Sequence, residues 1–168
     1  LFTALSNITF DIKDGATVSI IGKSGSGKST LMHIMSGLDR PTSGSVIIND
    51  QNLARLKDKE TDLFRAKQIG FIFQAFFIEA NQTCLQNVMR PLEIAETGPR
   101  ERRATARTAL ESVDLLEKLN VKAGKLSGGQ KQRLAIARSI VNDPKIIFAD
   151  EPTGNLDSST GDKIIKLL

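Results

Sequence analysis

Several residue types are scarce in this sequence, and each shortage excludes a class of structure or site. The chain of 168 residues has one cysteine, one histidine and neither tryptophan nor tyrosine. Its single cysteine, Cys84, cannot form a disulfide within the chain, so we expect a reducing compartment. A Cys/His cluster of the kind that holds structural zinc is missing, and no apolar stretch approaches the ~20 residues that a membrane-spanning helix needs.

The overall charge is only mildly basic. The hydrophobic and charged fractions, 40% and 25%, are ordinary for one globular domain with its own core. The net charge of +4 comes from lysines and arginines that are scattered rather than clustered, so we expect no nucleic-acid partner. The sequence begins at Leu1 rather than methionine and stops within a helical pattern, so we also expect a fragment truncated at both ends.

Short β-rich runs alternate with helical patterns, which is typical of an α/β domain. We expect strands at residues 17–21, 46–48, 69–73 and 145–149, and helices at 29–36, 57–67, 99–119 and 129–141. The strands lie towards the two ends of the chain, and residues 76–142 are nearly all helical. We therefore predict one domain, with residues 1–75 and 143–168 as an α/β core and residues 76–142 as an inserted helical subdomain.

A glycine-rich stretch, GKSGSGKST, stands between the first expected strand and the first expected helix. Glycines let backbone N–H groups converge on phosphate oxygens, and the helix adds the positive end of its dipole. This pattern predicts a phosphate-binding loop (P-loop, or Walker A motif), with Lys28 on the β- and γ-phosphates, Ser29 on Mg²⁺ and Thr30 on the α-phosphate. The residues expected to contact the nucleotide here are Gly22, Ser24, Gly25, Gly27, Lys28, Ser29 and Thr30.

The stretch KIIFADE delivers two adjacent carboxylates at the C-terminal end of an apolar strand. Ligands of open α/β sheets bind at this edge. We expect Asp150 to complete the magnesium shell and Glu151 to polarise the water that attacks the γ-phosphate. From this pattern alone, an exposed acid that caps the next turn remains the alternative for Glu151.

A second open helix N-terminus occurs at LSGGQKQRLAIAR. Ser127, Gly128 and Gly129 supply a hydroxyl group and free N–H groups, which predicts another phosphate-binding end. One γ-phosphate does not need two such ends from one chain, so we expect this end to close over a nucleotide held by another copy. An ordinary N-capped helix after a Gly-Gly turn is the alternative.

The motifs GKSGSGKST, LSGGQ, FADE and GNLD occur in one order. Together they resemble the nucleotide-binding domain of ATP-binding cassette (ABC) transporters over essentially the whole chain, and GLDRPTSG and DEPTGNLDS are most similar to the lipoprotein-release and macrolide-export ATPases. The resemblance implies a P-loop NTPase core with a parallel sheet, an N-terminal antiparallel β part and a helical subdomain. It also implies an ATP-hydrolysing subunit that powers a membrane transporter, of an export or lipoprotein-release type.

Further roles follow from the resemblance alone. Gln74 corresponds to a glutamine that reaches Mg²⁺ and senses the γ-phosphate. Ser127, Gly128, Gly129 and Gln130 correspond to the signature that binds the γ-phosphate held by the partner chain. Residues 155–157 correspond to a loop that crosses the dimer interface. Phe76 and Phe77 lie where a membrane subunit docks, with core packing of one of them as the open alternative.

The implied partners are a second nucleotide-binding domain, in a homodimer, and a membrane-spanning subunit at the cytoplasmic face of a bacterial inner membrane. A soluble ABC ATPase that acts on ribosomes or nucleic acid is the alternative. The DNA-repair type carries a long coiled coil, for which the segment between Gln74 and Ser127 is too short. The stretch FFIEA, where related chains often read FNLLP, leaves the identity of the membrane subunit open.

Overall fold

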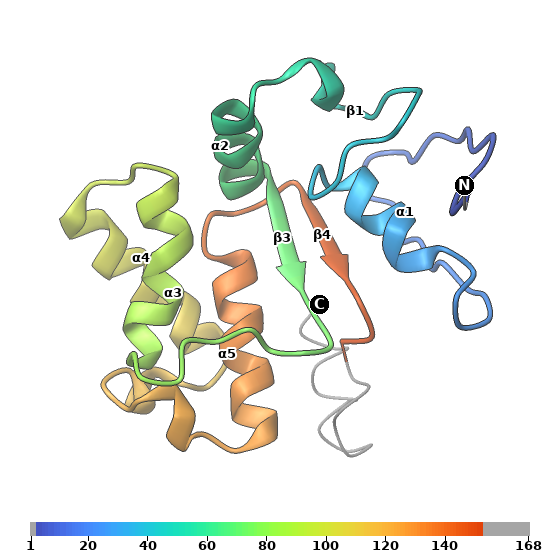
Figure 1. Cartoon of the computed structure of the whole chain (residues 1–168). Coiled ribbons are helices and arrows are strands. Elements are labelled where there is room, and N and C mark those ends of the chain that lie inside the picture. Colours follow the sequence, from blue (N-terminus) through green and yellow to red (C-terminus); the bar gives the residue numbers. More distant parts are fainter. Residues whose placement is uncertain (1–2, 153–168) are drawn as a thin grey trace. The chain divides into compact units, whose positions relative to one another are not determined.

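The computed structural model describes residues 3–152 and divides into two compact units, residues 1–56 and residues 57–168, which are taken separately below. The loop of residues 155–157 lies outside the described residues. Within residues 3–152, no helix has the length and apolar character needed to cross a membrane. The α-helices are α1 (Lys28–Met35), α2 (Asp58–Gln68), α3 (Cys84–Ile94), α4 (Pro99–Ser112) and α5 (Gly128–Ile140), and the strands are β1 (Ile47–Ile48), β2 (Gln51–Asn52), β3 (Ile69–Ile72) and β4 (Ile146–Ala149) (Figure 1).

The first unit contains α1 and a short hairpin. Helix α1 ends in a Schellman motif, in which Gly37 takes a φ of 69° and the Leu38 N–H reaches back to the His33 carbonyl at 2.9 Å. Strands β1 and β2 pair antiparallel, and the turn between them has positive φ at both Asn49 and Asp50, as in a type I′ hairpin. The prediction of a strand at 46–48 is confirmed over Ile47–Ile48.

The predicted strand at residues 17–21 is wrong for this structure. The segment has no strand assignment, and the side chain of Ile21 is 91% exposed. A strand is held by hydrogen bonds to a neighbouring strand, and within the described residues the pairing partners are β1 with β2 and β3 with β4. The apolar sequence alone therefore does not produce an extended, paired segment here.

The second unit is built on a parallel pair of strands. Strands β3 and β4 run side by side with Ile69 opposite Ile146, and the Asp150 N–H extends the pairing by a bond to the Ile72 carbonyl at 2.8 Å (Figure 1). Both strands were predicted. The expectation that β4 is buried holds only for Phe148, because Ile147 is 40% exposed. Both strands end at the same edge, so the residues that follow them lie close together.

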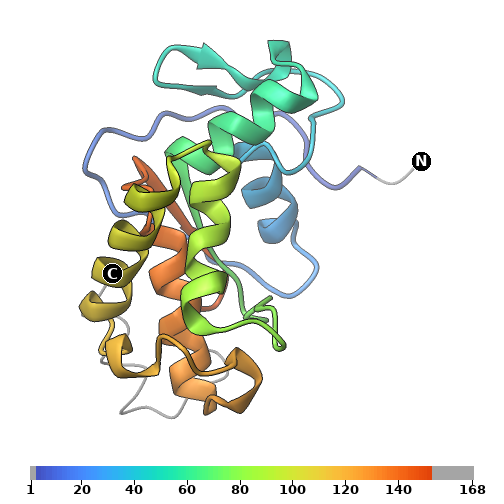
Figure 2. The same ribbon diagram turned by 90° about the vertical axis from the view of Figure 1, so that its left-hand side faces the viewer.

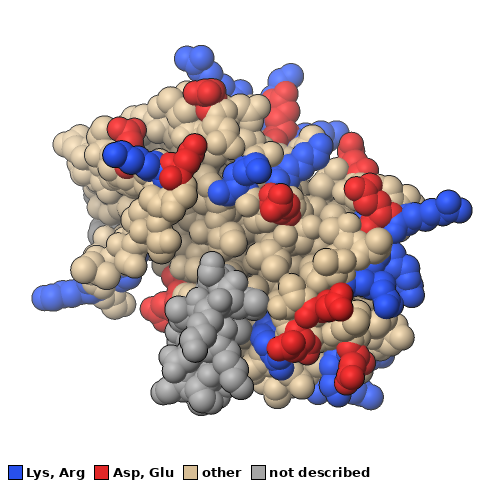
Figure 3. Space-filling model, turned by 180° about the vertical axis from the view of Figure 1, so that it is seen from behind, with Lys and Arg blue, Asp and Glu red and all other residues tan. Residues whose placement is uncertain are grey.

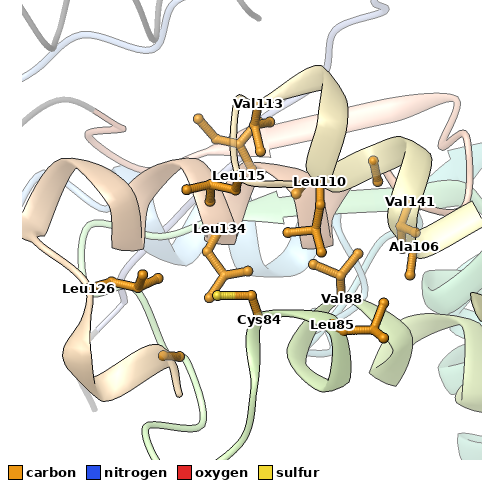
Figure 4. Close-up of a cluster of buried hydrophobic side chains, with 14 of the residues drawn as sticks. Cys84, Leu85, Val88, Ala106, Leu110, Val113, Leu115, Leu126, Leu134 and Val141 are labelled. Carbon is orange, nitrogen blue, oxygen red and sulfur yellow. The ribbon is translucent and has the colours of Figure 1, made fainter. Parts of the chain in front are cut away.

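Helices α3, α4 and α5 pack against one another around a common core (Figure 2). In the close-up, the side chains of Cys84, Val88, Leu110 and Leu134 converge between the three helices (Figure 4). The positions Ala106 and Leu110, expected to face the core from their helical spacing, are fully buried. The helical character predicted for residues 76–142 is confirmed, while the division of the chain into a core and an inserted subdomain stays a prediction.

Helix α4 is shorter than the sequence indicated. It ends at Ser112 rather than near residue 119. A second Schellman motif stops it: Asp114 takes a φ of 55°, and the Leu115 N–H bonds the Leu110 carbonyl at 2.8 Å. An aspartate rather than a glycine occupies the left-handed position, so no clear stop signal for the helix is visible in the sequence there.

Candidate functional site

The P-loop wraps the start of α1 in the first unit. Gly27 is the N-cap residue of α1 and has a φ of 90°, a conformation that favours glycine. A Cβ atom at this position would lie 2.9 Å from both the Ala4 carbonyl oxygen and the Leu5 side chain. The N–H groups of the first helical turn have no acceptor within a helix, so the loop presents backbone donors where the sequence predicted them.

Lys28, the first residue of α1, turns its ammonium group back over the loop. Its Nζ donates hydrogen bonds to the carbonyl oxygens of Gly22 and Lys23, each at 3.0 Å. The positive charge therefore lies within the same loop as the backbone donors at the start of α1. Ser29, on the next position of the helix, is exposed. This arrangement concentrates positive potential and hydrogen-bond donors on one short segment, which is what an anionic phosphate group requires.

In the second unit, Gln74 and Glu151 meet at the edge where β3 and β4 end. The Gln74 Nε2 donates a hydrogen bond to the Glu151 Oε2 at 2.8 Å, although the two residues are 77 positions apart in sequence. Asp150 stands directly after β4 and is partly buried, whereas Glu151 is exposed. The structure thus brings the side chains of Gln74 and Glu151 together. Asp150, the third residue expected in this site, directly precedes Glu151 at the same edge.

The backbone at Glu151 is strained. Its φ of 46° lies in the left-handed region, which costs a non-glycine residue about 1–2 kcal/mol. On one side, the Asp150 N–H is bonded to Ile72. On the other, the carbonyl of Pro152 accepts a hydrogen bond from the Gln132 side chain of α5. Anchors on both sides therefore hold the conformation.

The start of α5 forms a capping box. The Gln130 N–H donates to the Ser127 Oγ at 3.3 Å, and the Ser127 N–H donates to the Gln130 Oε1 at 3.0 Å. The N-capped helix that the sequence offers as the alternative interpretation of these residues is therefore present. Gly128 and Gly129 occupy the first two helical positions, where N–H groups have no intrahelical acceptor. The end is thus capped and still offers two backbone donors beside an exposed serine.

Arg138 of α5 is hydrogen-bonded to the segment that follows Gln74. Its guanidinium donates to the carbonyl of Phe77 and, at 3.0 Å, to that of Phe76. Burial lowers the pKa of Arg138, and the nearby Glu79 carboxylate partly opposes that effect. Phe77 is 69% exposed and Phe76 partly buried, so neither belongs to the buried core.

Gln132 and Arg138 were not singled out from the sequence. A signal for Gln132 existed, because it shares one helical face with the buried Ile136 and Ser139. A polar side chain on such a face needs a partner. The described residues contain no group of three or more His, Cys, Asp or Glu side chains placed to hold a metal ion.

Comparison with known proteins gives concordant matches. The family model for "ABC transporter" matches residues 5–154. An ABC transporter ATP-binding protein of Thermotoga maritima is 46% identical over 164 residues, which cover 98% of this chain and 70% of the relative. The lipoprotein-releasing system ATP-binding protein LolD of Syntrophotalea carbinolica is also 46% identical, with 98% of this chain and 72% of the relative covered.

Solved structures agree. The dimeric structure of MJ0796, a bacterial ABC transporter cassette, matches with a TM-score of 0.88 at 46% identity over 98% of this chain and 72% of that chain. A dimeric post-hydrolysis state of the same cassette, bound to ADP and Pi, matches equally well. The α/β cassette fold predicted from the sequence is confirmed. The chain belongs to the ABC transporter family, as an ATP-binding and ATP-hydrolysing subunit that powers a membrane transporter.

Proposed function

We propose that this chain hydrolyses ATP at a composite site, formed by the P-loop of one copy and the Ser127 end of α5 in a second copy. The observation that carries the proposal is the Gln74–Glu151 hydrogen bond at the ends of β3 and β4. It holds a carboxylate at the sheet edge where α/β proteins bind their ligands. A dimeric cassette at 46% identity supports the participation of a second copy.

The P-loop residues bind the triphosphate in this proposal. Gly22, Ser24, Gly25 and Gly27 shape the loop so that backbone N–H groups face the phosphate oxygens. On binding, Lys28 exchanges its two loop carbonyls for the β- and γ-phosphates, where charge-assisted bonds are stronger. Thr30 contacts the α-phosphate.

The donor set fits Mg²⁺. The Ser29 hydroxyl, the Gln74 amide oxygen and the Asp150 carboxylate are hard oxygen ligands, and Mg²⁺ keeps several waters rather than an all-carboxylate cage. When bound, Mg²⁺ neutralises negative charge on the β- and γ-phosphates.

Glu151 polarises the attacking water, with Gln74 beside it. The carboxylate is exposed and its Oε2 is held by the Gln74 amide, so its other oxygen can accept a proton or a hydrogen bond from water. Holding one oxygen reduces the number of rotamers that Glu151 can adopt. Gln74 therefore orients the base as well as contributing to the magnesium shell.

The Ser127 end of α5 contacts the γ-phosphate of the partner's nucleotide. Its hydroxyl accepts from Gln130 and can still donate its own proton, while Gly128 and Gly129 add two N–H donors. Gln130 fixes the turn through the capping box. Ser127 is exposed, as a contact to a second chain requires.

The membrane-spanning partner docks over the segment after Gln74, at the cytoplasmic face of a bacterial inner membrane. The exposed Phe77 supports this, because a large aromatic side chain at the surface is suited to an interface. The LolD relative supports a lipoprotein-release or export type of transporter. On the face in Figure 3, basic and acidic side chains are interspersed, which does not favour a nucleic-acid partner.

The test replaces Glu151 with glutamine. Glu151→Gln keeps the shape but removes the charge, so ATP still binds while hydrolysis falls at least about 100-fold. An ATP-bound dimer then accumulates and can be followed by size-exclusion chromatography. Glu96→Gln is the matched control, because Glu96 is also exposed with a positive φ of 62°. A Glu151→Gln protein that hydrolyses ATP at the normal rate would contradict the proposal.

A further inference from the structure

Gln132 is a buried amide on α5 that contacts the backbone just beyond Glu151. Its side chain is 1% exposed, and its Nε2 donates a hydrogen bond to the carbonyl oxygen of Pro152. Its Oε1 is buried and has no hydrogen-bond partner among the described residues. Two of its neighbours one and two turns along the helix, Ile136 and Ser139, are buried as well.

The unpartnered Oε1 of Gln132 shows which of the two amide atoms makes a useful contact. The Pro152 carbonyl oxygen can only accept a hydrogen bond. The Gln132 amide must therefore turn its nitrogen towards Pro152, because in the flipped orientation Oε1 and the carbonyl oxygen would repel each other. An apolar side chain of the same size would avoid burying an unpaired oxygen. A glutamine at this position can donate the hydrogen bond to Pro152, whereas a methionine or a leucine cannot.

The residue between the two backbone anchors is Glu151. The bond from the Asp150 N–H to Ile72 fixes the chain before it, and the bond from Gln132 fixes the chain after it. Glu151 itself has a φ of 46°, which relaxes when its surroundings do not hold it. Loss of the second anchor alone frees the backbone to rotate the carboxylate away from its position beside Gln74.

We propose that Gln132 is a positioning residue for hydrolysis, which holds the strained backbone of Glu151 through the Pro152 carbonyl. The inference rests on the proposed role of Glu151. Gln132 acts on Glu151 through the Pro152 carbonyl, so its contribution is confined to the direction in which the Glu151 side chain points. Because α5 also begins at Ser127, the helix that carries the partner-facing end directly supports the carboxylate of its own chain.

The experiment measures ATP hydrolysis by the full chain with Gln132→Met. The kcat should fall about tenfold, while the KM for ATP changes less than about twofold, because a misdirected base affects the transition state and not nucleotide binding. Gln82→Met is the matched control, since Gln82 also has a buried Oε1 without a partner. We expect the control to keep the wild-type kcat. A normal kcat in Gln132→Met would overturn the proposal.

A double-mutant cycle separates positioning from a general loss of stability. In single-turnover measurements on Glu151→Gln, adding Gln132→Met should lower the residual rate less than about twofold, because the group it positions is already inactive. A full tenfold further loss would overturn the proposal. Gln132→Leu gives a second substitution if the methionine variant does not fold. If Glu151→Gln is fully active, the proposed function itself fails; if only Gln132→Met is fully active, the positioning role alone fails.

Discussion

A Cβ atom on Gly70 of β3 would lie 2.5 Å from the Ser139 carbonyl oxygen of α5. Real Cβ atoms do not approach oxygens so closely, and the obstacle is backbone rather than a flexible side chain. Gly70→Ala should therefore destabilise the protein by about 1–3 kcal/mol, measured by urea unfolding. Gly98→Ala is the control, because no atom lies within 4 Å of its added Cβ, and we expect a change below about 1 kcal/mol. Equal effects of the two changes would show that α5 and β3 have room to separate.

The Gln74–Glu151 bond predicts different outcomes for two substitutions at Gln74. Gln74→Leu removes the donor and should lower kcat about tenfold. Gln74→Glu replaces the N–H donor by a second carboxylate, which repels the negative charge of Glu151. Its kcat should therefore fall further than that of Gln74→Leu, measured for both variants at saturating ATP. Equal kcat values for the two variants would show that these side chains do not interact during turnover.

The proposed composite site predicts complementation between two inactive proteins. Lys28→Ala removes a phosphate contact, and Ser127→Arg blocks the partner-facing end of α5. Each homodimer then has two defective sites, but a mixed dimer regains one site with an intact Lys28 and an intact Ser127. Mixing should raise nucleotide trapping, and phosphate release where the sites act independently. If mixed dimers form and neither quantity rises, Ser127 belongs to an ordinary capped helix.

The buried thiol of Cys84 predicts a loss of stability at alkaline pH. Burial raises the pKa of Cys84, because the thiolate is poorly solvated between the helices. A group whose pKa is raised on folding contributes stability below its unfolded pKa, and that contribution falls as the pH rises above about 8.5. The difference in unfolding free energy between the wild type and Cys84→Ala should thus decrease from pH 7 to pH 10. A constant difference over this range would show that the thiol does not titrate on unfolding.

Helix ends illustrate what the sequence could and could not predict. Helix α1 stops at a Schellman motif with Gly37 in the left-handed position, and glycine is the recognised signal. Helix α4 stops at the same motif with Asp114, which the sequence does not distinguish from a helical aspartate. The hydrogen bonds are alike in both motifs. What the sequence does not indicate is that Asp114 takes a positive φ.

The candidate site divides in the same way. The side chains of the P-loop, Asp150, Glu151 and Ser127 form continuous motifs, and their chemistry could be recognised in the sequence. Gln132 and Arg138 act on main-chain carbonyls of Pro152 and Phe76, which any residue carries. Such contacts leave no pattern in the sequence at the residue whose carbonyl accepts the hydrogen bond. For the strand expected at 17–21, the apolar pattern is clear in the sequence, but the sequence does not show whether a neighbouring strand is available to pair with it.

The hydrogen bonds from Arg138 to the carbonyls of Phe76 and Phe77 have an evolutionary consequence. Main-chain recognition is insensitive to side-chain identity, so substitutions at these two positions leave the anchor intact. Under the proposed docking of a membrane subunit at this segment, the exposed surface is free to diversify while the hydrogen bonds beneath it stay constant. One ATP-driven cassette could then be adapted to different membrane subunits by a few exchanges in a single short segment.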